Sequence, residues 1–262
     1  MMKMMKTTLK PTLLVLAALF ILPIAPSPSW AESGKPKYGP QITPLSHSYE
    51  YFQKQPQSSF WSWIPYYIPQ RDGRSCSLAS VTMLLNSARS QTKLTQTDPL
   101  VTQDDLFKRI NSPIWNQGLG HLGRGVNLDQ LGELVRLSLK SYKISFYSVE
   151  VIHIDNDSEG TQNLVHQALL EMEKSKNTLI LANFLMSIYT EDAEVGHISP
   201  VGAYDSKKKQ VLILDSDRKW YEPYWVSEKT FLKGMATEDS DSKKKRGFVR
   251  VRLSESPQKS TR

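Results

Sequence analysis

Apolar residues recur at helical spacing in the stretch that follows the only cysteine of the chain. From Leu78 to Leu85 they predict a helix of about three turns that begins at Cys76. Capping residues or the same periodicity predict three further helices, over residues 102–110, 127–139 and 161–174. The first half of the chain is therefore expected to be mainly helical.

Later parts of the chain have the alternation and the β-branched content of strands. Residues 179–184 are almost continuously apolar, as in a strand buried on both faces. Residues 197–204 and 211–215 flank a lysine-rich turn and predict an antiparallel hairpin, and further strands are predicted over 144–154 and 248–252. Helices that come first and antiparallel strands that come later indicate an α+β fold.

The first 31 residues have the layout of a secretory signal peptide. A basic start precedes the apolar run Leu13–Ile24, and Ser29 and Ala31 provide the small residues of a cleavage site. The run is too short to span a bilayer comfortably, so we expect no stable membrane span after cleavage near Ala31. The mature protein is expected to be exported, either periplasmic or secreted; an uncleaved membrane anchor is the alternative.

The rest of the chain divides by composition into three parts. Residues 32–60 are polar and punctuated by prolines, which predicts an extended N-terminal arm. Residues 61–253 contain the predicted helices and strands and are expected to form one domain. Residues 254–262 are expected to be a flexible tail.

The charge of the chain argues against a nucleic-acid partner. Among 262 residues the formal net charge is +7, and it falls to +4 when the three lysines of the signal segment are removed. The basic clusters at 207–209 and 243–246 are short and lie between strand-like stretches, where solvated turns are expected. A nucleic-acid surface needs a broader basic stripe with stacking aromatic residues.

Cys76 cannot form an intrachain disulfide, because it has no second cysteine to pair with. At the start of a helix it meets free backbone N–H groups and the positive end of the helix dipole, which favour the thiolate over the thiol. A lone thiol in an exported protein is thus a candidate nucleophile. The alternative is a buried cysteine that packs as a small hydrophobic residue.

A cysteine nucleophile needs a nearby base and a further group that orients this base. His197 opens one strand of the predicted hairpin and Asp215 ends the other, so antiparallel pairing brings them to the same end. Gln70, six residues before Cys76, could add a side-chain N–H to the backbone N–H of Cys76 around a developing oxyanion. The sequence therefore predicts a Gln–Cys–His–Asp site.

The order and spacing of these residues resemble the papain-like cysteine peptidases and, among them, the phytochelatin synthase family. The match runs from about Trp61 to Val226 and rests on Gln70, on Cys76 with Met83–Asn86, on Arg124–Leu128, on Gly196–Pro200, and on Val211–Asp215 with Arg218 and Pro223–Val226. It implies a papain-like fold, in which a helical half with the nucleophile packs on an antiparallel sheet with His197 and Asp215. Residues 61–253 would then be a phytochelatin synthase-like catalytic domain.

The resemblance also implies a reaction. Cys76 would attack the Cys–Gly bond of glutathione and release glycine, and the γ-glutamylcysteinyl thioester would pass to water or to a second glutathione, giving γ-glutamylcysteine or a phytochelatin. His197 would act as base and then as acid, Asp215 would orient it, and Gln70 would donate to the oxyanion. The implied role is heavy-metal detoxification or glutathione turnover.

The resemblance suggests Arg218, Asn183 and Ser77 as substrate-binding residues, with bracing of the site as a second role for Arg218. Ser77 stands where the family has glycine, and no basic residue follows Asn183 where the family has one. The sequence contains no metal-ligand spacing, so we expect no intrinsic cofactor. Cadmium, zinc or copper is expected to arrive as a glutathione thiolate complex, because soft cations prefer sulfur.

Two other functions fit part of the pattern. A leader-peptide cysteine peptidase also has Gln, Cys, His and Asp in this order, and a non-catalytic exported thiol- or metal-binding protein could use the same scaffold. A homodimer is also left open. The sequence lacks the cysteine-rich C-terminal region of the plant enzymes, so, as for short bacterial members, we expect hydrolysis to be favoured over polymerisation.

Overall fold

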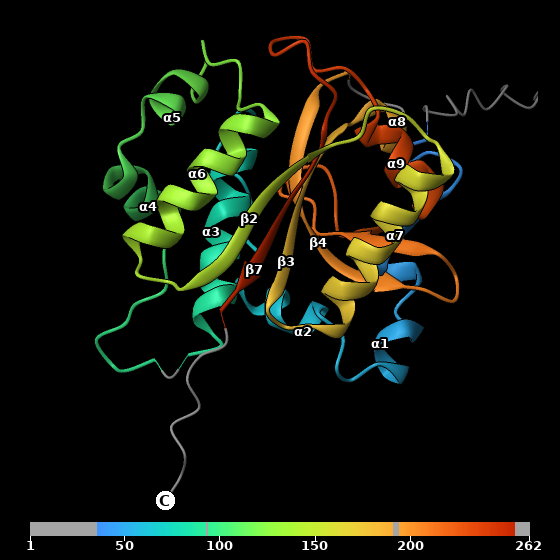
Figure 1. The fold of residues 1–262 in the computed structure, drawn as a ribbon, viewed down its shortest axis with the longest axis horizontal. Helices are drawn as coiled ribbons and strands as arrows, with labels where there is room; N and C mark the ends of the chain where they lie inside the picture. The colour runs from blue at the N-terminus through green and yellow to red at the C-terminus, as the bar shows by residue number, and fades with distance from the viewer. Residues whose placement is uncertain (1–35, 93, 191–193, 255–262) are drawn as a thin grey trace, which may run out of the picture. The chain divides into compact units, whose positions relative to one another are not determined.

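The computed structural model describes residues 36–92, 94–190 and 194–254, and Figure 1 shows their arrangement. The predicted signal peptide, the start of the predicted arm and residues 255–262 of the predicted tail lie outside these ranges. The helices are α1 (Glu50–Lys54), α2 (Phe60–Trp63), α3 (Cys76–Arg89), α4 (Gln103–Ile110), α5 (Pro113–Gly118), α6 (Leu128–Ser141), α7 (Glu159–Lys174), α8 (Ser187–Thr190) and α9 (Glu228–Met235), with 3-10 turns at Leu45–His47 and Ile64–Tyr66. The strands are β1 (Ile42–Pro44), β2 (Phe146–His153), β3 (Thr178–Leu185), β4 (Gly196–Asp205), β5 (Gln210–Ile213), β6 (Tyr224–Ser227) and β7 (Gly247–Leu253).

The strands form one antiparallel sheet in the order β1-β6-β5-β4-β3-β7-β2. Helices cover both of its faces: α3 to α6 lie on one side, and α7, α8 and α9 lie on the other (Figure 1). The fold therefore has a helical layer on each side of the sheet, and strand β4 is in contact with both α3 and α7.

Strand β3 shows why the sheet is buried on both faces. Leu179 and Leu181 belong to the hydrophobic core around α3 and α6, whereas Ile180, Ala182 and Phe184 belong to the core around α7 and α9. Successive side chains of a strand point to opposite faces, so a strand between two helical layers is apolar along most of its length. This explains the continuous apolar run in the sequence.

The structure confirms most of the predicted elements. The helix predicted from Cys76 begins at Cys76, and α4, α6 and α7 lie where helices are predicted, within two residues. The side chain of Thr102 caps α4 by accepting a hydrogen bond from the Asp105 N–H (3.1 Å). The predicted hairpin is β4–β5, and it ends earlier than expected, because Asp215 lies two residues beyond β5.

The expectation of an extended arm over residues 32–60 is wrong for its described part. Strand β1 pairs with β6, where Ile42 lies opposite Val226, and helix α1 follows. Phe52 stacks between the rings of Phe60 and Trp225, with centroid distances of 4.0 and 5.8 Å. Aromatic residues that sequence reasoning treated as part of a polar segment therefore attach this segment to the sheet.

Helices α5 and α9 and strand β6 are not predicted from the sequence, and the predicted domain boundary at residue 61 falls inside α2. These elements are short, and pairing or packing with distant segments stabilises them more than their own periodicity does. Within the ranges that the structure describes, no helix has the length and apolar character needed to cross a membrane.

Gly247 opens β7 at a point where the backbone passes very close to its neighbour. It lies between β2 and β3, opposite His153 and Asn183, and a Cβ atom on it would lie 1.9 Å from the carbonyl oxygen of Ile152. A side chain here can be accommodated only if the pairing of β2 with β7 shifts.

We therefore expect Gly247→Ala to lower the free energy of unfolding by about 1–3 kcal/mol, as overpacking does. Gly160→Ala is the matched control, because the nearest atom to its Cβ would be the Ser158 hydroxyl oxygen at 4.0 Å and the site lies in α7. The control should be neutral or slightly stabilising in denaturant unfolding. Equal stability of the two variants would contradict the close approach at Gly247.

Candidate active site

Cys76 lies at the first position of α3, behind a tight turn. The Asp72 N–H donates to the Ser75 hydroxyl (2.9 Å), and the Ser75 N–H donates back to the Asp72 carbonyl (3.2 Å). This turn sets the direction in which the helix starts, and Cys76 is only 9% exposed. Cys76 therefore lies in the first turn of α3, whose backbone N–H groups have no partner within the helix.

His197 and Asp215 meet at one end of the β4–β5 hairpin. The His197 Nε2 atom lies 2.8 Å from Asp215 Oδ1, and the two side chains are 7% and 0% exposed. Because Nε2 faces the carboxylate, Nδ1 is the ring nitrogen left for the thiol of Cys76, with which His197 interacts. The hydroxyl of Ser80 on α3 donates to the carbonyl of Ile198 (3.0 Å), which ties the cysteine helix to the histidine strand.

Charges in this buried pair stabilise each other. Burial alone would lower the pKa of His197, but the Asp215 carboxylate and the contact with Cys76 raise this pKa well above its usual value. Burial alone would raise the pKa of Asp215, but His197, Tyr224 and the backbone N–H of Asp217 hold it below its usual value. The arrangement favours an imidazolium next to the thiol.

Tyr224 is a member of this site that sequence reasoning missed. Its hydroxyl donates to Asp215 Oδ2 (2.7 Å), while Oδ1 accepts from the Asp217 N–H (2.8 Å) in addition to facing His197. Tyr224 lies on β6, next to β5, and is fully buried. Only the pairing of β5 with β6, which was not predicted, brings it to the carboxylate.

Gln70 lies beside the segment that follows Asp215. Its backbone N–H donates to the Ser216 carbonyl (2.8 Å), and its side-chain Oε1 accepts from the Ser216 hydroxyl (3.2 Å). With Oε1 occupied, the amide nitrogen is the end of the side chain that remains available as a donor. The structure thus fixes Gln70 next to the His–Asp end of the hairpin.

Arg218 and Ser77, two of the expected substrate-binding residues, make contacts within the protein. The Arg218 guanidinium lies over the ring of Tyr67 (4.5 Å), whose hydroxyl donates to the Asp215 carbonyl (2.6 Å). Ser77 is buried, and its hydroxyl accepts from the indole N–H of Trp115 on α5 (3.1 Å). Neither lines the cavity beside Cys76, so the bracing role is the one that fits Arg218.

A cavity of about 230 Å³ opens beside Cys76. Asn183, the third expected substrate-binding residue, does line it, and its Oδ1 atom is buried without a partner in the described part of the chain. Buried polar atoms are rarely left without a hydrogen bond, so Asn183 is an unusual polar side chain in the lining of this cavity.

Arg246 also lines this cavity, against the expectation of a solvated turn at residues 243–246. It is 4% exposed and lies over Gly196, and its guanidinium lies 3.5 Å from Asp239 and donates to the carbonyl of Glu238 (2.5 Å). Its Nε atom has no partner in the described ranges, and burial lowers its pKa. Sequence reasoning missed Arg246 because it follows three lysines, and such a basic run is usually exposed to solvent.

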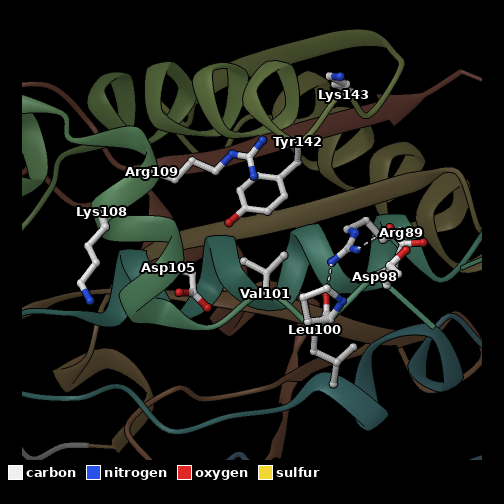
Figure 2. Close-up of a pocket in the computed structure, with 11 residues that line it drawn as sticks. Arg89, Asp98, Leu100, Val101, Asp105, Lys108, Arg109, Tyr142 and Lys143 are labelled. Carbon is white, nitrogen blue, oxygen red and sulfur yellow. Dashed lines mark hydrogen bonds and ion pairs between the residues drawn. The ribbon is translucent and has the colours of Figure 1, made fainter. Parts of the chain in front are cut away.

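Another hollow, of about 800 Å³, lies away from these residues, between α4 and the segment that precedes it (Figure 2). Its rim carries Arg89, Lys108, Arg109 and Lys143, and the Arg109 guanidinium lies over the ring of Tyr142 (4.3 Å). It contains no cysteine or histidine. In the described residues no group of three or more His, Cys, Asp or Glu could hold a metal ion. Cys76 and its cavity are thus the candidate active site.

Comparison with known proteins agrees with this site. The family model for phytochelatin synthase matches residues 46–248. Glutathione gamma-glutamylcysteinyltransferase 1 of Arabidopsis thaliana is 24% identical over 205 residues, which cover 77% of this chain and 39% of the relative. Glutathione gamma-glutamylcysteinyltransferase of Schizosaccharomyces pombe is 32% identical over 74 residues, which cover 28% of this chain and 18% of the relative. This chain thus spans about two fifths of the length of the plant relative. The family model matches most of the residues of this chain, which shows that the chain belongs to the phytochelatin synthase family, a family of enzymes with a papain-like fold.

Proposed function

We propose that this protein cleaves the Cys–Gly peptide bond of glutathione through a γ-glutamylcysteinyl thioester on Cys76. The observation that carries the proposal is the buried His197–Asp215 pair (2.8 Å) next to a thiol at the start of a helix. The relatives named as glutathione gamma-glutamylcysteinyltransferases support glutathione as the substrate.

In the first half of the reaction the Cys76 thiolate attacks the carbonyl carbon of the cysteinyl residue of glutathione. The oxyanion that forms accepts hydrogen bonds from the Cys76 backbone N–H and the Gln70 side-chain N–H. The His197 imidazolium gives its Nδ1 proton to the nitrogen of the departing glycine, and the C–N bond breaks. Asp215, held by Tyr224 and Asp217, keeps the imidazole ring in the orientation that this transfer needs.

In the second half, neutral His197 takes a proton from water or from the amino group of a second glutathione. The activated nucleophile attacks the thioester, and the thiolate of Cys76 leaves. Water gives γ-glutamylcysteine, and glutathione gives a phytochelatin. A heavy-metal ion would take part as a glutathione thiolate complex, and we propose a role in metal detoxification or glutathione turnover outside the cytoplasm.

The cavity suits the acyl part of this substrate. Glutathione carries amide N–H groups, an ammonium group and two carboxylates, and the side chains of Asn183 and Arg246 line the cavity. A substrate amide could donate to Asn183, and a carboxylate or carbonyl could accept from Arg246.

The decisive test is glycine release from glutathione, followed by mass spectrometry with and without cadmium. Wild-type protein should release glycine and carry a γ-glutamylcysteinyl adduct on Cys76, and Cys76→Ala should do neither. Cys76→Ala should still bind glutathione, because binding does not need the thiol. If reduced wild-type protein binds glutathione and forms neither glycine nor adduct, it is a binding protein and the proposed reaction is wrong.

Replacement of Gln70 tests the oxyanion contact. Gln70→Ala should reduce kcat by about 10²-fold with a small change in KM, because the donor acts on a charge that exists only in the transition state. Gln53→Ala, at an exposed position of α1, is the control and should behave as wild type. A loss confined to KM would assign Gln70 to substrate binding instead.

Removal of the Tyr224 hydroxyl should change the pH dependence. The hydrogen bond to Oδ2 helps to hold the pKa of Asp215 low, so Tyr224→Phe raises this pKa. Asp215 then becomes protonated, and the imidazolium loses its partner, at a higher pH than in wild type. The acid limb of a pH profile for alkylation of Cys76 by iodoacetamide should move to higher pH, and Tyr147→Phe, at an exposed position of β2, should leave it in place.

A further inference from the structure

The cavity beside Cys76 is lined by equal numbers of cations and anions. The cations are Arg74, Arg124 and Arg246, and the anions are Glu194, Asp239 and Asp241. Arg124 pairs with Asp241 (3.6 Å), and Arg246 pairs with Asp239 (3.5 Å). Arg74 is the remaining cation, and its guanidinium has no ion-pair or hydrogen-bond partner among the described residues.

Arg74 is held by its backbone rather than by its side chain. Its N–H donates to the Asp72 carboxylate (2.8 Å), and it stands inside the turn that Asp72 and Ser75 close. This turn leads directly into α3, so Arg74 precedes the nucleophile by two residues. The backbone is fixed while the long side chain is free to bind a ligand at the mouth of the cavity.

We propose that Arg74 binds the carboxylate of the residue that leaves, the C-terminal glycine when glutathione is the substrate. This carboxylate lies one carbon beyond the scissile nitrogen and must therefore be close to Cys76 during attack. The turn after Asn183, from Leu185 to Ser187, offers no cation for it. A guanidinium binds a carboxylate through two parallel hydrogen bonds, which would fix both the substrate and the bond to be cleaved.

This inference rests on the proposed function for the identity of the leaving group, and it makes Arg74 a determinant of specificity. A protein with this contact cleaves before a C-terminal residue with a free carboxylate and rejects longer peptides or esters at this position. The γ-glutamyl carboxylate of glutathione is the other anion that Arg74 could bind, and the experiment separates the two.

The test measures binding in a Cys76→Ala background, in which the substrate stays intact. The ligands are glutathione, its glycine ethyl ester and γ-aminobutyryl-cysteinyl-glycine, which lacks the γ-glutamyl carboxylate. In the Cys76→Ala protein itself, the ester should bind about tenfold more weakly than glutathione, because it loses a charge-assisted hydrogen-bonded pair. Adding Arg74→Gln should weaken glutathione and the γ-aminobutyryl analogue about tenfold and leave the ester unchanged.

The matched control is Arg71→Gln in the same background. Arg71 belongs to the same loop but pairs with Asp104, lies over the ring of Phe107 and does not line the cavity. Arg71→Gln should preserve the preference for glutathione over the ester. Far-ultraviolet circular dichroism and the unfolding midpoint of Arg74→Gln should match those of the background protein, because the side chain makes no contact that supports the turn.

Three results would overturn the assignment. If Arg74→Gln binds glutathione as tightly as the background protein does, Arg74 contacts neither carboxylate. If Arg74→Gln weakens glutathione but not the γ-aminobutyryl analogue, Arg74 binds the γ-glutamyl carboxylate instead of the glycine carboxylate. Absence of glutathione binding in the background protein would remove both this proposal and the proposed function. If glutathione binding depends on Arg74 but the wild-type protein releases no glycine, the Arg74 contact stands and only the proposed reaction is wrong.

Discussion

The site depends on one buried ion pair, between His197 and Asp215. Two ionisable groups removed from water are costly unless each is paired and hydrogen-bonded, and this pair satisfies that condition through Tyr224 and the Asp217 N–H. These partners come from β6 and from the loop after β5, so the register of three neighbouring strands determines the protonation of one imidazole. Strand β4 then carries this imidazole to the helix that holds Cys76.

The sequence predicted the parts of this arrangement that depend on local chemistry. The helix that begins at Cys76 has its own apolar periodicity, and the β4–β5 hairpin has a short turn between two apolar runs, so neither needs information from distant residues. The hairpin brings His197 and Asp215 to the same end, and because Asp215 lies beyond β5, the loop after β5 also contributes to their contact. The roles of these residues remain proposals, whereas their proximity is observed.

The parts that the sequence did not predict depend on long-range pairing. Tyr224 reaches Asp215 only because β6 lies beside β5, and Arg246 reaches the cavity because β7 inserts between β2 and β3 far from its sequence neighbours. Arg246 follows three lysines, and composition alone assigns such a run to solvent. The contact of Ser77 with Trp115 is also long-range, because Trp115 lies on α5, which is not predicted from the sequence.

The thiol and the imidazole come from two different layers of the fold. The helical layer that contains α3 supplies Cys76, and the sheet supplies His197, so the two groups meet where α3 packs against β4. The cavity at this junction is lined by two internal ion pairs, and Arg74 and Glu194 are the cation and the anion left without an ion-pair partner among the described residues. A small substrate with charges of both signs would find a partner for each at the mouth of the cavity, where both side chains are exposed. This charge complementarity supports the proposal of a short, charged peptide as the substrate over the interior of a polypeptide chain.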